Sequence, residues 1–348
     1  MRFCTSVVFL AGTTCFVIAA PVADETIPSD GPSFCGKLVL FGAQREPRKS
    51  GTVEILTMDP DGTGVESLVK VNDVGRMTGR ISPDGRRIAF GTISGDGKGS
   101  ETWILKADGS RRKVLIDGMI RAWSPDGTSL GCFRQKGADG WESLRIEVES
   151  GRVHTMPVPQ SDLIEDWSSR GETLSVMAGN REHVFKHPGK GTYPLRQIDL
   201  IASDGSRRWR ITKDPLLDNI WSRFSPDGSL VAHEQRRHIK DKVFEYYVVC
   251  GRDGGHPVEV IRGDKLDEEL HVVESYPSYP YYWLPNSAPC WSPDGSRIVA
   301  CLSNAKWARG ITDKLRFALV FATPEGQFER GVDLKKLGIV FVCEIDWK

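Results

Sequence analysis

The segment with the most obvious capacity for recognition is a run of aromatic residues and prolines between Glu274 and Asn286. It carries five aromatic side chains, Tyr276, Tyr279, Tyr281, Tyr282 and Trp283. Large aromatic side chains are enriched at binding hot spots, and the prolines keep the segment stiff, so that little conformational entropy is lost on binding. The composition indicates a recognition surface. The alternative is that this segment plugs or covers the structure beneath it.

Cationic side chains occur in two other segments that we expect to lie near this aromatic run. The first segment contains His233, Arg236, Arg237 and His238. The second contains Trp307 and Arg309. Aromatic and cationic side chains together suit a peptide, a carbohydrate or an anionic glycan.

His233 and His238 bracket a sequence that is similar to a zinc-protease motif but differs in its spacing. The motif H-E-x-x-H lies on a helix, and its four-residue spacing brings both imidazoles to one face. Here the spacing is five residues, and the segment is expected to leave a strand. The two histidines could still join Glu165, Asp166 and Asp218 in a divalent-metal site, and this alternative stays open.

Four further carboxylates belong to copies of the tetrapeptide S-P-D-G, each of which precedes a short strand-like run such as RRIAF. The aspartates are Asp84, Asp126, Asp227 and Asp294. Proline presets the backbone of a tight turn, aspartate tolerates the geometry that follows, and glycine supplies a positive φ. We therefore expect these aspartates to be structural parts of turns that join antiparallel strands.

The spacing of this turn predicts the fold. Two degenerate copies, at residues 33–36 and 168–171, complete a series whose serines are 49, 42, 44, 57 and 67 residues apart. A repeat of this length is typical of one propeller blade of four strands. A second series of turns, mostly D-G, alternates with the first. Six copies of each predict an all-β fold, a six-bladed β-propeller of four-stranded antiparallel blades.

Two other patterns indicate how the blades are assembled. An aromatic residue often precedes the turn serine (Trp123, Trp167, Phe224 and Trp291) and suits an anchor packed between blades. The repeat at residues 33–36 has no inner strand before it, whereas residues 342–347 resemble an inner strand with nothing after it. The C-terminal strand is therefore predicted to complete the first blade and close the ring.

Both series of tight turns are expected on one face of the propeller, here called the tight-turn face. The longer connections then emerge on the opposite, long-loop face, where binding usually occurs. We expect these connections at residues 94–100, 135–140, 179–194, 235–242, 264–287 and 303–314.

Composition and the N-terminus indicate an exported protein. Residues 1–20 read as a signal peptide, with Arg2 before an apolar run and cleavage at about residues 19–23; residues 21–32 form a short segment, and residues 33–348 form the propeller. The apolar run is shorter than the roughly 20 residues of a membrane span. Basic and acidic residues balance at 46 each, which gives no support for nucleic-acid binding. We expect a periplasmic or secreted protein without a membrane span in the mature chain.

The pattern W-S-P-D-G-x-x-I-A-F, clearest at residues 122–127 and 290–300, resembles the TolB-type (WD40-like) propeller repeat. The resemblance covers essentially the whole mature chain and implies a propeller without the globular domain that precedes it in TolB. In TolB such a propeller binds partner proteins of the cell envelope. Similar repeats occur in the propellers of prolyl-oligopeptidase-like enzymes and in oligogalacturonate lyases, whose propeller bears a metal.

The sequence therefore predicts an exported, non-catalytic binding or scaffold propeller that recognises a peptide, protein or glycan on its long-loop face, without a cofactor. The alternative is a metal-dependent polysaccharide lyase of the oligogalacturonate type, or a hydrolase, with a divalent metal at the axial mouth. Fold alone does not choose between these functions.

Overall fold

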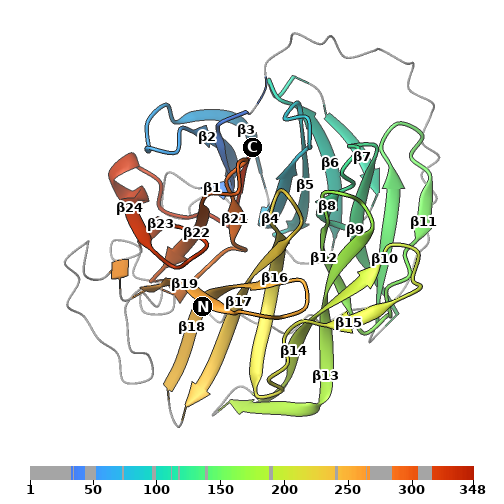
Figure 1. Ribbon diagram of the computed structural model, residues 1–348. Coiled ribbons are helices and arrows are strands. Elements are labelled where there is room, and N and C mark those ends of the chain that lie inside the picture. Colours follow the sequence, from blue (N-terminus) through green and yellow to red (C-terminus); the bar gives the residue numbers. More distant parts are fainter. Residues whose placement is uncertain are drawn as a thin grey trace.

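The protein consists almost entirely of antiparallel β-strands in this computed structural model (Figure 1). The structure describes residues 33, 35–43, 52–72, 74–95, 99–110, 112–116, 118–137, 140–187, 191–239, 242–263, 265–266, 284–304 and 316–348. The 3-10 helix η1 (Leu334–Leu337) follows the last outer strand. Within the described ranges, no helix has the length and apolar character needed to cross a membrane.

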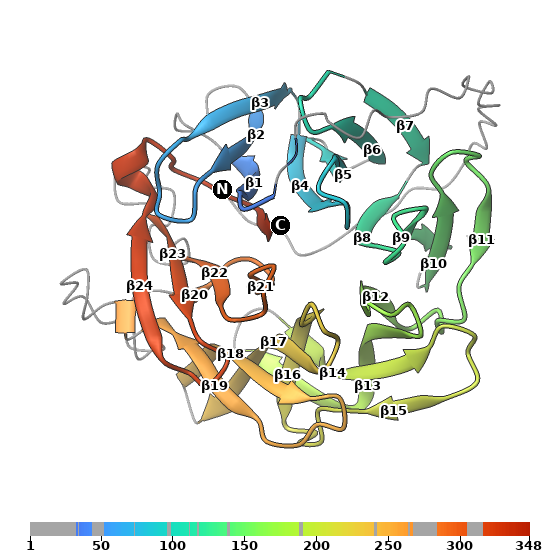
Figure 2. The ribbon, with the colours of Figure 1, turned by 45° about the horizontal axis from the view of Figure 1, so that its top comes forward.

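The strands form six sheets that surround a common axis, which confirms the predicted six-bladed propeller (Figure 2). Blade one consists of β25 (Glu344–Trp347), β1 (Leu38–Ala43), β2 (Val53–Met58) and β3 (Glu66–Val71). Blade two consists of β4 (Val74–Ile81), β5 (Arg87–Ser94), β6 (Ser100–Lys106) and β7 (Arg112–Ile116). Blade three consists of β8 (Met119–Trp123), β9 (Ser129–Lys136), β10 (Gly140–Glu147) and β11 (Val153–Thr155).

Blades four to six follow in chain order and continue the ring. Blade four consists of β12 (Leu163–Trp167), β13 (Thr173–His187), β14 (Gly191–Ala202) and β15 (Arg208–Arg210). Blade five consists of β16 (Leu217–Phe224), β17 (Leu230–Ile239), β18 (Lys242–Gly251) and β19 (Val258–Arg262). Blade six consists of β20 (Leu284–Pro285), β21 (Cys290–Trp291), β22 (Ile298–Ser303), β23 (Phe317–Ala322) and β24 (Phe328–Asp333). In blade six, β20 and β21 both pair with β22 and together take the place of the inner strand.

The C-terminal strand closes the ring, as the sequence predicts. Strand β25 pairs antiparallel with β1, with Trp347 opposite Leu38 and Glu344 opposite Phe41. The two ends of the described chain therefore share blade one, and β25 covers the edge that β1 would otherwise expose towards the axis.

Each S-P-D-G turn is held by its own side chains. In the blade-six turn, the Ser292 hydroxyl donates to Asp294 Oδ1 (2.6 Å), and that oxygen also accepts from the Ser296 backbone N–H (3.0 Å). Gly295 has a φ of +72°, and an added Cβ would lie 3.6 Å from Pro226 in the equivalent turn of blade five. The turn residues therefore fix the hairpin and also let neighbouring turns approach each other.

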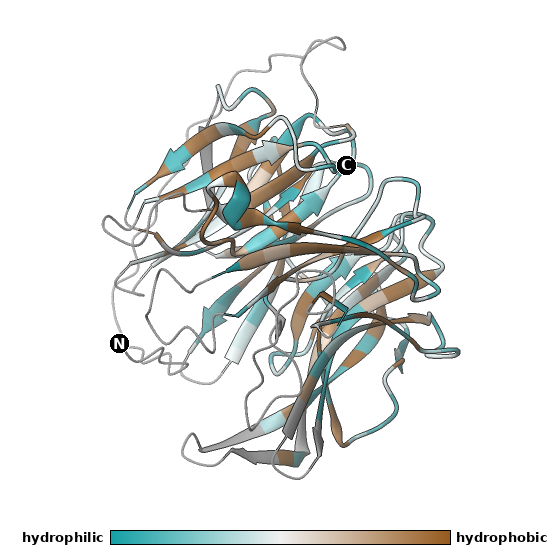
Figure 3. Ribbon diagram, turned by 90° about the vertical axis from the view of Figure 1, so that its left-hand side faces the viewer, coloured by the Kyte–Doolittle hydropathy of each residue, from teal (hydrophilic) through white to brown (hydrophobic). Residues whose placement is uncertain are grey.

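The hydrophobic core is divided among the interfaces between neighbouring blades. Figure 3 shows apolar colouring along the middle of the strands and polar colouring towards their ends. One cluster joins blades six and one through Val299, Phe321 and Trp347, and equivalent clusters lie at the other interfaces. The ring is therefore stabilised by packing between blades as well as by pairing within them.

Two tryptophans that precede a turn serine connect one blade to the previous one. Trp123 Nε1 donates to the backbone oxygen of Arg80 (3.1 Å), and Trp291 Nε1 donates to that of Arg223 (3.2 Å). Both indoles are buried, at 6% and 5% exposure. They are inter-blade anchors, as their position in the repeat predicts.

Two of the predicted long connections are instead extended hairpins. Pairing of β13 with β14 continues beyond residue 179 to His187 opposite Gly191, and pairing of β17 with β18 continues to Ile239 opposite Lys242. A register shift between Asn180 and Val184 absorbs the extra residues of β13. The polar sequence of these segments suggests loops, but backbone pairing continues through them because a bulge accommodates the mismatch.

Candidate functional site

The structure divides the predicted recognition surface into a described part and a part outside the described residues. Seven of the predicted site residues lie outside the described ranges: Tyr276, Tyr279, Tyr281, Tyr282, Trp283, Trp307 and Arg309. His238 belongs to β17 by its backbone, but its side chain lies outside the description. His233, Arg236 and Arg237 are described.

His233 is buried within the propeller rather than exposed on its long-loop face. Its exposed fraction is 1%, and side-chain alternation places it on the same face of β17 as Val231, which packs between blades four and five. Neither ring nitrogen has a hydrogen-bond partner among the described residues. Burial lowers the pKa of His233 to about 4, so the imidazole is neutral near pH 7. The structure thus corrects the expectation of a cationic surface histidine.

Arg236 points to the opposite face of β17 and is neutralised by carboxylates. Its Nε lies 2.6 Å from Glu234 Oε1 and 3.4 Å from Glu245 Oε1, and its Nη1 lies 3.9 Å from Asp218 Oδ2. Burial tends to lower the pKa of Arg236, but these carboxylates outweigh it, and the pKa is raised. Arg236 is therefore not a free cation of the kind that the sequence predicts, and it lies on the opposite face of β17 from His233 because adjacent strand residues point in opposite directions.

Arg237 remains exposed and is the described cation of this group that is open to solvent. Its guanidinium lies 5.9 Å from the centre of the Tyr246 ring. Tyr246 in turn donates its hydroxyl to Gln235 (2.9 Å). Arg237 therefore lies exposed near the end of the blade-five hairpin, where it pairs with Phe244.

A second set of charged residues, of which only Glu165 is a candidate from the sequence, lies on the innermost strands around the axis (Figure 2). We call it the axial cluster, and its members are Arg80 on β4, Arg121 on β8, Glu165 on β12, Arg223 on β16 and Glu344 on β25. Each is at most 9% exposed. The available sequence signal was an arginine two or three residues before the turn serine in three blades.

The contacts within the axial cluster are incomplete. Arg80 Nη1 lies 3.6 Å from Glu344 Oε1, and Glu165 Oε2 accepts from the backbone N–H of Ser222 (2.7 Å). Arg80 Nε, Arg223 Nη2 and Glu165 Oε1 are buried without a partner among the described residues. Buried polar atoms are normally hydrogen-bonded, and ordered water is the usual partner of such atoms where the protein supplies none.

Arg121 is the least compensated member of the axial cluster. It makes no hydrogen bond or ion pair with a described residue, and its guanidinium lies 5.1 Å from the centre of the Phe133 ring. Burial lowers the pKa of Arg121, Glu165 opposes this effect, and the neighbouring Arg76 and Arg80 lower the pKa further. At Arg121, repulsion from the cations Arg76 and Arg80 is thus opposed by attraction from the carboxylates of Glu165 and Glu344.

Carboxylates on the inner strands connect successive blades. Asp346 Oδ2 accepts from the Ile81 N–H (2.7 Å), and Asp166 Oδ2 accepts from the Phe224 N–H (2.8 Å). Burial raises the pKa of Asp166 to about 7 and also raises that of Asp346. Each of these two carboxylates already accepts a backbone N–H from the next blade. They are therefore structural contacts between blades rather than free ligands for a metal ion.

The described residues do not fit the divalent-metal alternative. Within them, no group of three or more His, Cys, Asp or Glu side chains converges as a set of metal ligands. Asp218 is engaged by Arg196 through a 2.6 Å ion pair, and Glu165 and Asp166 each accept a backbone N–H from blade five. The turn aspartates are likewise occupied by their own turns, and the Ser292 hydroxyl lowers the pKa of Asp294 to about 2.

No protein-family model matches this sequence, and no curated protein matches it. Solved structures do match its fold. TolB from Acinetobacter baumannii superposes with a TM-score of 0.65 at 15% identity, over 91% of this chain and 68% of that protein. The fold is that of a TolB-type six-bladed propeller.

Other solved propellers share this TolB-type architecture at similarly low identity. A chain of a nidogen/laminin complex matches with a TM-score of 0.55 and 11% identity, over 89% of this chain and 98% of that one. An oligogalacturonate lyase from Vibrio parahaemolyticus matches with a TM-score of 0.48 and 12% identity, over 88% and 80%. Identities this low establish the fold alone, and the lyase match is too distant to support an activity.

Proposed function

We propose that this protein is an exported binding propeller that recognises a peptide, protein or glycan on its long-loop face. The observation that carries the proposal is the buried guanidinium of Arg121, which makes no hydrogen bond or ion pair with a described residue and interacts with a second cation, Arg76. Arg76 is exposed near the start of β4, where the chain enters from the long-loop face, and Arg121 lies on the neighbouring inner strand.

This arrangement suits recognition better than stability. A buried guanidinium without a direct partner costs folding free energy, because its desolvation and its repulsion from Arg76 are opposed only by attraction from Glu165 and Glu344, without an ion pair. A partner that presents an acidic or hydroxyl-rich group at this mouth would supply the missing acceptors. The exposed Arg237, near the end of the blade-five hairpin, adds a further positive charge to the proposed partner surface.

The aromatic segment completes the proposed surface. Trp283 is followed directly by β20 (Leu284–Pro285), which pairs with β22 in the part of blade six nearest the axis. The first described residue after this segment, Leu284, thus lies in the inner part of blade six. A rigid aromatic side chain there would act as a hot-spot anchor for the partner.

The proposal is tested by capturing partners from the exported protein fraction of the source cells by cross-linking, with identification by mass spectrometry. Arg237→Ala and Trp283→Ala should each lose the partner that the unmodified protein retains, with Trp283→Ala weakening binding by about 2 kcal/mol or more. Arg207→Ala is the matched control, since Arg207 is also exposed and lies over an aromatic ring, Trp209, at 4.9 Å. Equal capture by all variants, or turnover of polygalacturonate with added Mn²⁺, would contradict the proposal.

A further inference from the structure

One tryptophan breaks the inter-blade pattern. Trp167 precedes the turn serine in blade four, as Trp123 and Trp291 do in blades three and six. Those two indoles donate to a backbone oxygen of the preceding blade, whereas Trp167 Nε1 donates to Gly171 O within its own turn (3.0 Å). The Trp167 indole N–H is therefore bonded within blade four and not to blade three.

The interface beside Trp167 is correspondingly the least filled by apolar side chains. Its cluster holds three buried residues, Met156, Ile164 and Leu174, whereas the clusters at the other interfaces hold between 6 and 16. Trp167 packs against this cluster but stays partly exposed, while Trp123 and Trp291 are buried. An indole that does not fill its interface leaves space beside it.

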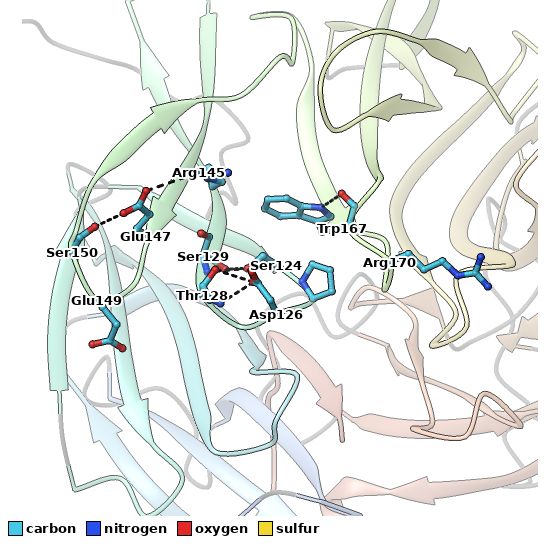
Figure 4. Close-up of a pocket in the computed structure, with 12 residues that line it drawn as sticks. Ser124, Asp126, Thr128, Ser129, Arg145, Glu147, Glu149, Ser150, Trp167 and Arg170 are labelled. Carbon is cyan, nitrogen blue, oxygen red and sulfur yellow. Dashed lines mark hydrogen bonds and ion pairs between the residues drawn. The ribbon is translucent and has the colours of Figure 1, made fainter. Parts of the chain in front are cut away.

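A groove of about 900 Å³ occupies this space on the tight-turn face, between blades three and four. Figure 4 shows the Trp167 ring between the S-P-D-G turn of blade three and the side chains of β10, while Arg170 points away from the ring. The volume lies within the range of small-ligand sites, roughly 300 to 1,000 Å³.

The lining of this groove is unusual for a pocket that binds an apolar ligand. Trp167 is its one aromatic residue and Pro125 its one aliphatic ring; the other lining residues are Ser124, Asp126, Thr128, Ser129, Arg145, Glu147, Glu149, Ser150, Arg170 and Gly171. No Leu, Ile, Val, Met or Phe lines it. A complementary ligand has one flat apolar face and many hydroxyl groups, which is the chemistry of a sugar ring.

Polar groups beside the indole are positioned to hold such hydroxyls. The side chain of Arg145 is 44% exposed, makes no hydrogen bond with a described residue, and has only a 3.8 Å ion pair with Glu147. Glu147 is fixed in place by the Ser150 hydroxyl (2.5 Å) and by His154 Nε2 (2.9 Å). The Arg145 guanidinium therefore has free donors, and Glu147 is a preorganised acceptor next to it.

We infer that the groove between blades three and four binds a saccharide, with a sugar ring stacked on Trp167 and its hydroxyls hydrogen-bonded to Arg145 and Glu147. This site lies on the face opposite the proposed partner surface and does not depend on that proposal. A peptide is less well matched, because the groove offers no aliphatic pocket for its side chains.

The inference is tested by calorimetric titration of the full chain with cellotriose, chitotriose, maltotriose, mannotriose and trigalacturonate. At least one trisaccharide should bind, and Trp167→Ala and Arg145→Ala should each weaken that binding by at least about tenfold. Arg145→Ala is included because Arg145 is exposed and its loss leaves the blade interface intact. Arg207→Ala should bind with the affinity of the unmodified protein, and all variants should keep the capture of a long-loop partner.

Three results would overturn the inference. One is that none of the five trisaccharides binds the folded protein. Another is that a trisaccharide binds equally well to the Trp167 and Arg145 variants, which would place the sugar elsewhere. The third is that a proline-rich peptide binds at Trp167 while the trisaccharides do not, which would assign the groove to peptides.

Discussion

At the residue scale, burial decides what a charged or titratable side chain can contribute. Arg236 and His233 are separated by only two residues on β17, but Arg236 is surrounded by carboxylates whereas His233 has no described hydrogen-bond partner. The imidazole stays neutral because protonation would place an unpaired charge inside the protein. His233 is therefore a source of acid sensitivity and not part of a binding surface.

This role of His233 predicts a defined dependence of stability on pH. Its folded pKa of about 4 lies below the ordinary value of 6.5. Between these values the unfolded chain binds a proton that the folded chain does not, so stability is lost as the pH falls from about 6.5 to 4. Relative to His233→Leu, the protein should lose roughly 2 to 3 kcal/mol more between pH 7 and pH 4.5.

The measurement is chemical denaturation of both proteins at the two pH values. The comparison cancels the titration of other groups, such as the inner-strand carboxylates, because they are present in both proteins. Parallel stability curves for the two proteins would show that His233 does not carry this acid sensitivity.

At the scale of single elements, the inner strands and their turns hold neighbouring blades together. The indole of Trp291 on β21 fills the interface between blades five and six and bonds to the Arg223 carbonyl. Its removal leaves a cavity and an unpaired buried acceptor at the same time. Such anchors are expected to affect stability far more than the exposed hairpin ends do.

Two substitutions at Trp291 separate packing from hydrogen bonding. Trp291→Ala should destabilise the protein by about 3 to 5 kcal/mol through lost packing, and Trp291→Phe by about 1 to 3 kcal/mol, since it removes the donor to Arg223 but keeps most of the ring. Thermal unfolding of both variants tests this order. Equal losses would mean that packing at this interface contributes little.

The repeat pattern predicted these elements well because turn chemistry is local. In the blade-six turn, Ser292 and Asp294 hold the hairpin by hydrogen bonds within the turn and to the next residue. The four residues S-P-D-G are therefore enough to predict the hairpin. The different role of Trp167 was not predictable, because the carbonyl that an indole reaches depends on how closely the next blade approaches. The axial cluster as a whole was not predictable for the same reason: Arg121 and Glu165 are far apart in sequence and become neighbours only when blades three and four pack together.

At the scale of the whole molecule, closure by β25 makes the propeller a single ring. Because β25 pairs with β1 and packs in the cluster between blades six and one, it links the last blade to the first. Both the axial cluster and the interfaces depend on this closure, since Glu344 itself lies on β25.

Deletion of residues 341–348 should therefore give an open ring that is insoluble or strongly destabilised. The deletion exposes the paired edge of β1 and removes Trp347 and Ile345 from a core cluster. Removal of Lys348 alone, which leaves β25 intact, is the matched control. Solubility and thermal unfolding of the two truncated proteins check the prediction, and a long truncation that unfolds at the same temperature as the full chain would contradict it.

The central claim is that the protein binds a partner at its long-loop mouth, and Arg121→Met tests it most directly. Methionine removes an unpaired charge from the axial cluster and retains most of the side-chain volume. We predict that the free energy of unfolding stays unchanged or rises by about 1 kcal/mol or more, as when a buried charge is replaced by a hydrophobic side chain, while capture of the long-loop partner is lost. A variant that captures the partner as well as the unmodified protein does, or one that unfolds because Arg121 was needed for stability, would contradict the account.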